Sequence, residues 1–292
     1  MDTIILAPFI HKKGKKLNNT EFLRMIMMNK EELVKKVIEQ KVDKKSLMLL
    51  VSLYRSNQIE KLSFMLRKMF LDIFNKACEI LGIFRLKVDI LAGDSCKHSI
   101  FYDKDNFRVV VIIGRFLETC EVYEKCIGLS FSDVLTYMTL HEIGHHQLNL
   151  IEVAPKNNVD SARYFVIYSM FEDYIISRYL RGDIYRELEK KIIKFEATQA
   201  CRKLDIKILR DRSFWKAGHV MRAFVARWVD QIALIGLAVA LNYIDQKDLD
   251  LPENIKNLIL LIADSMEKIT EDKIKKAPNI AYDAWLEYLA YL

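Results

Sequence analysis

Glycine and proline are scarce in this chain of 292 residues, which contains nine glycines and four prolines. Because these residues favour turns and interrupt helices, their scarcity argues for a helix-rich globular protein with few long loops. Low-complexity runs, Pro/Ser-rich linkers and internal repeats are also missing. Hydrophobic residues make up 51% of the chain, which is enough for one large core or two smaller ones.

Long apolar segments are absent as well. The longest uninterrupted one, residues 232–241, is too short to cross a bilayer, so we expect no membrane span. The first residues lack the order of a secretory signal, because the lysines within residues 12–16 follow a short apolar run instead of preceding it.

The spacing of the cysteines and the net charge indicate which cellular compartment and which binding partners to expect. The five cysteines are odd in number and none forms a C-x-x-C pair, so we expect reduced thiols in a cytoplasmic protein. The net charge of +6 is mildly basic, but no nucleic-acid recognition motif accompanies the lysine clusters. The sequence therefore shows no clear nucleic-acid motif and supports nucleic-acid binding only weakly.

One short segment, His141-Glu142-Ile143-Gly144-His145, carries the clearest chemistry in the chain. Histidines four residues apart lie on the same face of a helix, so both imidazoles can reach one metal ion. Glu142 lies about 100° round the helix from His141, where its carboxylate can act on a water in an open coordination position. This is the H-E-x-x-H arrangement of zinc metallopeptidases, with two ligands and a general base.

The surroundings of the motif predict a buried helix. Apolar residues recur at helical spacing over residues 132–140, and Leu148 and Leu150 continue the pattern. Buried imidazoles need partners, and a metal ion is a suitable one. The alternative interpretation is a pair of packed core histidines without a metal.

A catalytic zinc site usually has a third protein ligand. Leu148 and Ile151 stand where metzincins carry a glycine and a third histidine, which excludes that class. The helix predicted over residues 159–180 offers Glu172, on an apolar stripe where an unpaired carboxylate is costly to bury. We predict Glu172 as the third ligand, with Asp173 as its rival.

These residues resemble the gluzincins, the clan of zinc metallopeptidases whose third ligand is a glutamate on the helix after H-E-x-x-H, and in particular the minigluzincins and related soluble enzymes. The resemblance covers roughly residues 62–182. It lies in the H-E-x-x-H motif and in a Glu-Asp pair followed by aromatic and aliphatic residues, at positions 172–176. It implies that His141, His145 and Glu172 bind Zn²⁺ and that Glu142 is the general base in hydrolysis of a peptide bond of a protein or peptide substrate.

One position departs from the pattern. Thermolysin-type enzymes carry an aspartate four residues after the ligand glutamate, where it orients a zinc-bound histidine. Ile176 stands there in this chain. Asp173 is the candidate for this role beside His141.

The predicted fold class is α+β and mostly helical. A helix over residues 62–81 and strands over residues 86–91, 99–102 and 107–113 precede the two site helices. This is the order of a zincin-like core, in which a small sheet of about three strands packs on the active-site helix and the ligand helix. The resemblance further implies that strand 107–113 lies beside the cleft and pairs with an extended substrate, although an ordinary buried strand fits its residues equally.

Helices are predicted on both sides of this core. The expected division is an N-terminal helical segment (1–60), a catalytic core (61–182) and a C-terminal helical subdomain (183–292). Two helices are expected in residues 20–60, with Asn29 and Asp43 as N-caps. Later helices, over residues 184–204, 213–243, 252–269 and 278–288, are expected to form the other wall of the cleft. Among them His219 is a candidate for stabilising the oxyanion, against the alternative of a packed histidine.

Two further classes of function stay open at this point. One is a regulatory metallopeptidase that cleaves a single repressor-like or antitoxin-like partner. The other is a catalytically silent helical interaction protein with a zinc site. Glu142 argues against it, because a purely structural zinc site has no use for an acid beside an open coordination position. The sequence indicates neither a specificity pocket nor an oligomeric state.

Overall fold

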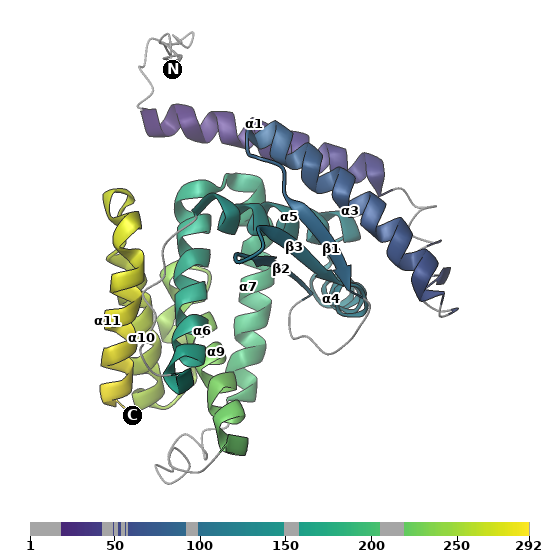
Figure 1. The fold of residues 1–292 in the computed structure, drawn as a ribbon. Coiled ribbons are helices and arrows are strands. Elements are labelled where there is room, and N and C mark those ends of the chain that lie inside the picture. The colour runs from purple at the N-terminus through teal and green to yellow at the C-terminus, as the bar shows by residue number, and fades with distance from the viewer. Residues whose placement is uncertain are drawn as a thin grey trace.

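The computed structural model describes residues 19–42, 49, 52–53, 56, 58–91, 99–148, 158–204 and 219–291. These residues form a mostly helical protein with one small mixed sheet, which confirms the predicted α+β class. Figure 1 shows the N-terminal helices and the C-terminal helices at opposite ends of the molecule, with the sheet near the N-terminal helices. None of the described helices combines the length and the apolar character that crossing a membrane requires.

Two long helices form the N-terminal end, α1 (Asn19–Lys41) and α3 (Ile59–Leu81). Helix α3 matches its prediction and ends at Gly82, whose φ of 74° gives a left-handed C-cap. Asn29 lies inside α1, so its prediction as an N-cap was wrong. The cost of asparagine inside a helix is under 1 kcal/mol relative to alanine, roughly, and the buried stripe of Val34 and Ile38 outweighs it. Asp43 lies outside the described residues.

The sheet contains β1 (Lys87–Leu91), β2 (Ile100–Asp103) and β3 (Arg108–Ile112), close to the predicted strands. Their order is β1-β3-β2, with β1 parallel and β2 antiparallel to β3. Both edges of β3 are therefore occupied by neighbouring strands, and the expectation that this strand pairs with a substrate was wrong. The edge strand next to the site is β2.

Helix α4 (Ile113–Ile127) follows β3 directly and was not predicted. Phe116, Cys120 and Tyr123 form its buried face, and the left-handed Gly128 ends it. The spacing of these three residues before a glycine is a helix signal, but the apolar run of β3 leads into it without a break and hides its start.

Helices α5 (Phe131–Leu148) and α6 (Asn158–Ile175) carry the site, and α6 continues as a short π-helix, η1 (Ile176–Leu180). Gly144 lets α5 and η1 approach closely, because a Cβ added at this position would lie 2.7 Å from Cγ2 of Ile176. The buried Arg181 also fixes α5, since its Nε donates a hydrogen bond of 2.8 Å to the carbonyl oxygen of Leu140. Ile176, at the position where thermolysin-type enzymes carry an aspartate, is thus a packing contact with Gly144 in this protein.

Four of the remaining described helices agree with the predicted positions: α7 (Asp183–Lys203), α9 (His219–Ala240), α10 (Glu253–Glu267) and α11 (Ala277–Tyr291). Two short 3₁₀ helices, η3 (Gln246–Asp248) and η4 (Glu271–Lys276), were not predicted. The buried side chains form two clusters. One joins the N-terminal helices, the sheet, α4, α5 and the first half of α7, and the other joins α6 and the second half of α7 with α9, α10 and α11. The two site helices therefore lie where these clusters meet.

Candidate metal centre

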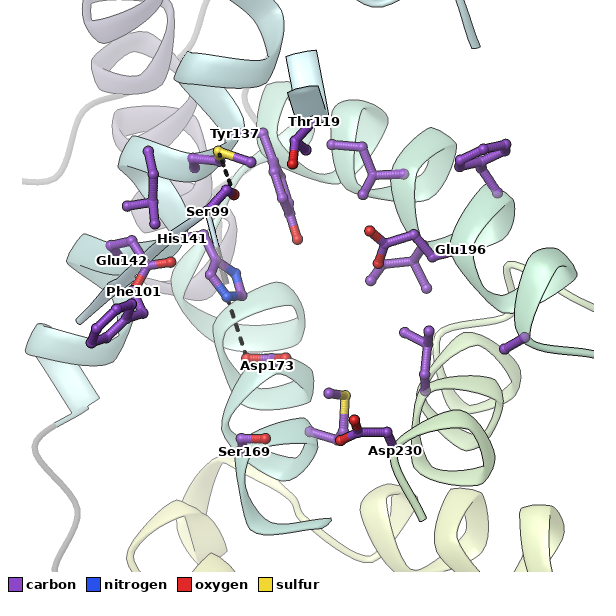
Figure 2. A pocket seen from close by; sticks show the side chains of 18 of the residues that line it. Ser99, Phe101, Thr119, Tyr137, His141, Glu142, Ser169, Asp173, Glu196 and Asp230 are labelled. Carbon is purple, nitrogen blue, oxygen red and sulfur yellow. Dashed lines mark hydrogen bonds and ion pairs between the residues drawn. The ribbon is translucent and has the colours of Figure 1, made fainter. Parts of the chain in front are cut away.

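The contact between α5 and α6 brings three potential metal ligands together. Nε2 of His141 lies 3.2 Å from Nε2 of His145, and Oδ1 of Asp173 lies 3.5 Å and 3.2 Å from these two nitrogens. Among the described residues, this is the group of three whose ligand atoms all lie within 4.8 Å of one another. Figure 2 shows the His141 ring directed toward Asp173 at one wall of a cavity.

The spacing of these atoms fits a tetrahedral zinc ion. Ligand atoms about 2.0–2.1 Å from zinc, separated by the tetrahedral angle, lie roughly 3.3 Å from each other. The three sides of this triangle, 3.2, 3.2 and 3.5 Å, agree with that value. Two imidazoles and one carboxylate also form a donor set that zinc commonly takes, with a fourth position left for water.

Glu172 lies on the other side of the His145 ring. Its Oε2 is 3.0 Å from Nδ1 of His145, and its Oε1 accepts a hydrogen bond of 2.7 Å from Nζ of Lys104. The structure thus brings Asp173 to the Nε2 atoms, while Glu172, the predicted third ligand, orients His145 from behind. The burial argument selected Glu172 because the sequence does not reveal that Lys104, 68 residues away in the turn after β2, offsets its charge.

The electrostatics of Glu172 agree with this role. Burial by itself raises the pKa of a carboxyl group, but the hydrogen bonds and positive charges of His145 and Lys104 hold the pKa of Glu172 below its ordinary value. Glu172 is therefore ionised, and its oxygens accept the hydrogen bond from Nδ1 of His145. This contact leaves Nε2 of His145 directed toward the triangle.

The two histidines together carry one positive charge when no metal ion is bound. Burial lowers the pKa of His141 to about 4. Burial acts on His145 in the same direction, but hydrogen bonds to Asp173 and Glu172 outweigh it and raise its pKa to about 10. The protonated His145 then places a cationic N–H group where the three ligand atoms meet. The surrounding charges thus favour a cation at this position.

Glu142 is buried beside the triangle, and burial raises its pKa to about 8. The backbone N–H of Tyr102 in strand β2 donates a hydrogen bond to its carboxylate. Figure 2 shows Glu142 between His141 and Phe101 of the same strand. A positive ion held at the triangle would lower this pKa through its charge, toward the range suited to a general base at neutral pH.

A cavity of about 1040 Å³ opens in front of these residues. Strand β2 and helices α4, α5 and α6 form one side, and residues of α7 and α9 line the rest. Of the four later helices that were expected to form the other wall, α7 and α9 do so, and Figure 2 shows Glu196 and Asp230 on it. No described residue of α10 or α11 lines the cavity. No described residue of α1 or α3 lines the cavity. His219 begins α9, but its side chain lies outside the described part of the chain.

Sequence reasoning missed a group of residues that support the site from α7. Nδ1 of His141 lies 2.8 Å from the hydroxyl of Tyr185, and that hydroxyl lies 3.0 Å from Oε1 of Glu189. The signal for them was present. Glu189 interrupts the apolar face of a helix whose buried residues include Tyr185, Leu188 and Ile192, and a buried acid calls for hydrogen-bond partners.

The comparisons with known proteins bear on none of these residues. Searches against protein-family models, curated proteins and solved structures gave no match to this chain.

Proposed function

We propose that this protein is a zinc-dependent metallopeptidase in which His141, His145 and Asp173 hold the metal and Glu142 is the general base. The observation that carries the proposal is the triangle of Nε2, Nε2 and Oδ1 with sides near 3.3 Å, next to a buried glutamate. A structural zinc site would have a fourth protein ligand and no need for an acid of raised pKa beside it.

The chemistry needs an electrophile and a base. A zinc ion at the triangle would polarise the scissile carbonyl and lower the pKa of a water molecule to roughly 7. Glu142 would take a proton from that water as the water oxygen bonds to the carbonyl carbon, and would deliver it to the amide nitrogen as the C–N bond breaks, so that one carboxyl group serves as base and then as acid. The hydrogen bond from the backbone N–H of Tyr102 holds the Glu142 carboxylate beside the triangle.

The edge strand β2 is the element that we propose for substrate binding. Ser99 accepts a hydrogen bond of 2.8 Å from Ile112 in β3 through its carbonyl oxygen, so alternation directs the backbone groups of Ile100 and Tyr102 to the opposite edge. Because the N–H of Tyr102 donates to Glu142, the groups that we propose for pairing are the N–H and carbonyl of Ile100 and the carbonyl of Tyr102. Both residues line the cavity. An extended peptide added along this edge would be bound mainly through its backbone, which gives affinity with little sequence selectivity.

The test measures metal content and cleavage on the same purified samples of the full chain. We expect about one zinc per chain, by mass spectrometry, and cleavage of casein or a peptide library in the wild type. Glu142→Gln should keep its zinc and lose cleavage, whereas Asp173→Asn should lose most of its zinc. Glu172→Gln should keep more zinc than Asp173→Asn, because the amide oxygen can still accept from His145.

Glu118→Gln serves as the matched control, because Glu118 also lines the cavity but pairs with Arg115 on α4 away from the triangle. It should match the wild type in both measurements. A wild-type protein without zinc would refute the metal centre, and undiminished cleavage by Glu142→Gln would refute the role of that residue. Zinc with cleavage of one partner protein only would favour a regulatory peptidase.

A further inference from the structure

We infer that Tyr185 and Glu189 on α7 are a positioning pair that holds His141 in the tautomer whose Nε2 can bind a metal at the triangle. The inference rests on the proposed metal site and goes beyond it, because neither residue belongs to the ligand triangle or to the acid–base chemistry. It assigns a function to a buried polar cluster in a part of the chain that the H-E-x-x-H motif does not reach.

The direction of the hydrogen bonds follows from Glu189, which is fully buried and which, above its raised pKa of about 7, is an ionised carboxylate that can only accept. Its Oε2 accepts hydrogen bonds from the hydroxyls of Ser177 and, at 2.7 Å, Tyr243. Its Oε1 accepts the hydroxyl proton of Tyr185 at 3.0 Å. A tyrosine hydroxyl has one proton to donate, so toward His141, 2.8 Å away, the Tyr185 oxygen acts as the acceptor.

This direction determines where the His141 proton lies. Because the Tyr185 oxygen accepts, Nδ1 of His141 carries the proton and Nε2 presents its lone pair to the triangle. If the hydroxyl turned and donated instead, Nδ1 would have to accept, and the proton of a neutral ring would move to Nε2. A proton at Nε2 excludes a metal from that atom.

Ring packing keeps the hydroxyl in place. The Tyr185 ring stacks on Tyr137 with a centroid distance of 5.3 Å, and Tyr137 lies 5.5 Å from the His141 ring. The rings of Tyr185 and His141 are nearly parallel, with an angle of 11° between their planes. The rings thus hold the hydroxyl oxygen between His141 and Glu189, and the Glu189 carboxylate determines which way its proton points.

The backbone of Tyr185 is hydrogen-bonded to a residue of the N-terminal helix α1. Gly182, which precedes α7, offers no capping side chain. The carboxylate of Glu31 in α1 replaces it, accepting hydrogen bonds from the backbone N–H groups of Gly182 at 2.7 Å and Tyr185 at 3.3 Å. Three helices, α1, α7 and α5, therefore act together on one metal-ligand tautomer.

The experiment compares Tyr185→Phe, Glu189→Ala and Glu189→Gln, with Tyr243→Phe as the control that contacts the same carboxylate but not His141. The first readout is the zinc dissociation constant, measured by competition with a chromophoric chelator. Loss of a hydrogen-bond partner behind a ligand histidine weakens metal binding by about 10–100-fold, which we expect for Tyr185→Phe and Glu189→Ala. Glu189→Gln should stay within about 3-fold of the wild type, because its amide oxygen can accept from Tyr185.

The second readout needs no metal. In metal-free protein labelled with ¹⁵N-histidine, at about pH 8 where Glu189 is ionised, long-range ¹H–¹⁵N spectra should show a proton retained on Nδ1 of His141 in the wild type, Glu189→Gln and Tyr243→Phe. That proton signal should be lost in Tyr185→Phe and Glu189→Ala. Thermal unfolding of each metal-free variant separates these effects from a general loss of fold.

The outcomes distinguish this inference from the proposed function. A wild-type protein that binds no zinc refutes the metal centre, while the Nδ1 signal still decides whether Tyr185 and Glu189 set the tautomer. Wild-type zinc affinity together with an unchanged Nδ1 signal in Tyr185→Phe overturns the inference. Equal weakening by Glu189→Gln and Glu189→Ala also overturns it, because the tautomer argument requires the glutamine to rescue.

Discussion

The backbone N–H of Tyr102 donates to the buried carboxylate of Glu142, so the edge strand and the H-E-x-x-H helix meet at the proposed catalytic base. The hydroxyl of the same tyrosine lies 2.8 Å from Nδ1 of His146, one residue past the motif. Strand β2 is thereby attached to α5 at two points. The strand proposed to bind substrate and the side chain proposed to act on it thus have a fixed relative position.

Enlarging Gly144 tests the close approach of α5 and η1. Gly144→Ala places a Cβ 2.7 Å from Cγ2 of Ile176, and we expect a loss of about 1–3 kcal/mol in the free energy of unfolding, despite the better helix propensity of alanine. Denaturant unfolding measures it. Ile176→Ala in the same chain should relieve the clash, so the double variant should be more stable than the sum of the single losses predicts. Additive losses would argue against a direct contact.

Removal of Lys104 tests how the buried Glu172 is tolerated. Lys104→Met leaves Glu172 with His145 as its remaining charged partner among the described contacts, and a loss of about 1 kcal/mol is expected because Lys104 is itself one-third exposed. Lys125→Met, which breaks an exposed pair with Glu121, should change stability by less than about 0.5 kcal/mol. Equal effects of both substitutions in thermal unfolding would contradict the importance of the Lys104 contact.

The pH dependence of stability should report Glu189. Burial raises its pKa from 4.5 in the unfolded chain to about 7 in the folded protein. The folded state therefore favours the protonated acid, so this contribution to stability is complete below pH 4.5 and is lost as the pH rises through 7. Glu189→Gln removes the titration. The free energy of unfolding of the metal-free wild type, relative to this variant, should fall between pH 5 and pH 8 by up to about 3 kcal/mol. A difference that does not change with pH would contradict this.

Glu31 and its neighbour Glu32 offer a matched pair on α1. Glu31→Ala removes the acceptor for two backbone N–H groups at the start of α7 and should cost about 1–2 kcal/mol of stability, as loss of an N-cap does. Glu32 is exposed and pairs with Lys36, so Glu32→Ala should be nearly neutral. Thermal unfolding compares them, and equal stabilities would show that the α1 contact does not cap α7.

The elements that the sequence predicted well have buried stripes and clear ends. The helix ending at Gly82 and the three short strands rest on local patterns of apolar residues and turn residues, and these patterns survive in the tertiary structure. Strand order depends on contacts far apart in the sequence, so β3 was expected at the cleft and β2 lies there instead. Helix α4 was missed because no polar or turn residue separates it from β3.

In the site too, local sequence patterns were predictive, whereas features that depend on contacts far apart in the sequence were not. The spacing of His141 and His145 fixes their common face through helix geometry alone, and their Nε2 atoms do converge. The roles of Glu172 and Asp173 could not be fixed this way. Adjacent helical positions point about 100° apart, and the partners that distinguish them, Lys104 and the two imidazoles, come from other segments.

The meeting of the two hydrophobic clusters at the site has a consequence for cooperativity. Both histidines project from α5, which packs with the sheet, whereas Asp173 projects from α6, which packs with the C-terminal helices. Helix α7 contributes buried residues to both cores. A metal ion held by all three ligands would be a second cross-link between these cores, and its binding free energy would oppose their separation. Chelation should therefore lower the coupling between the two halves of the protein and allow one core to lose protection from hydrogen exchange before the other.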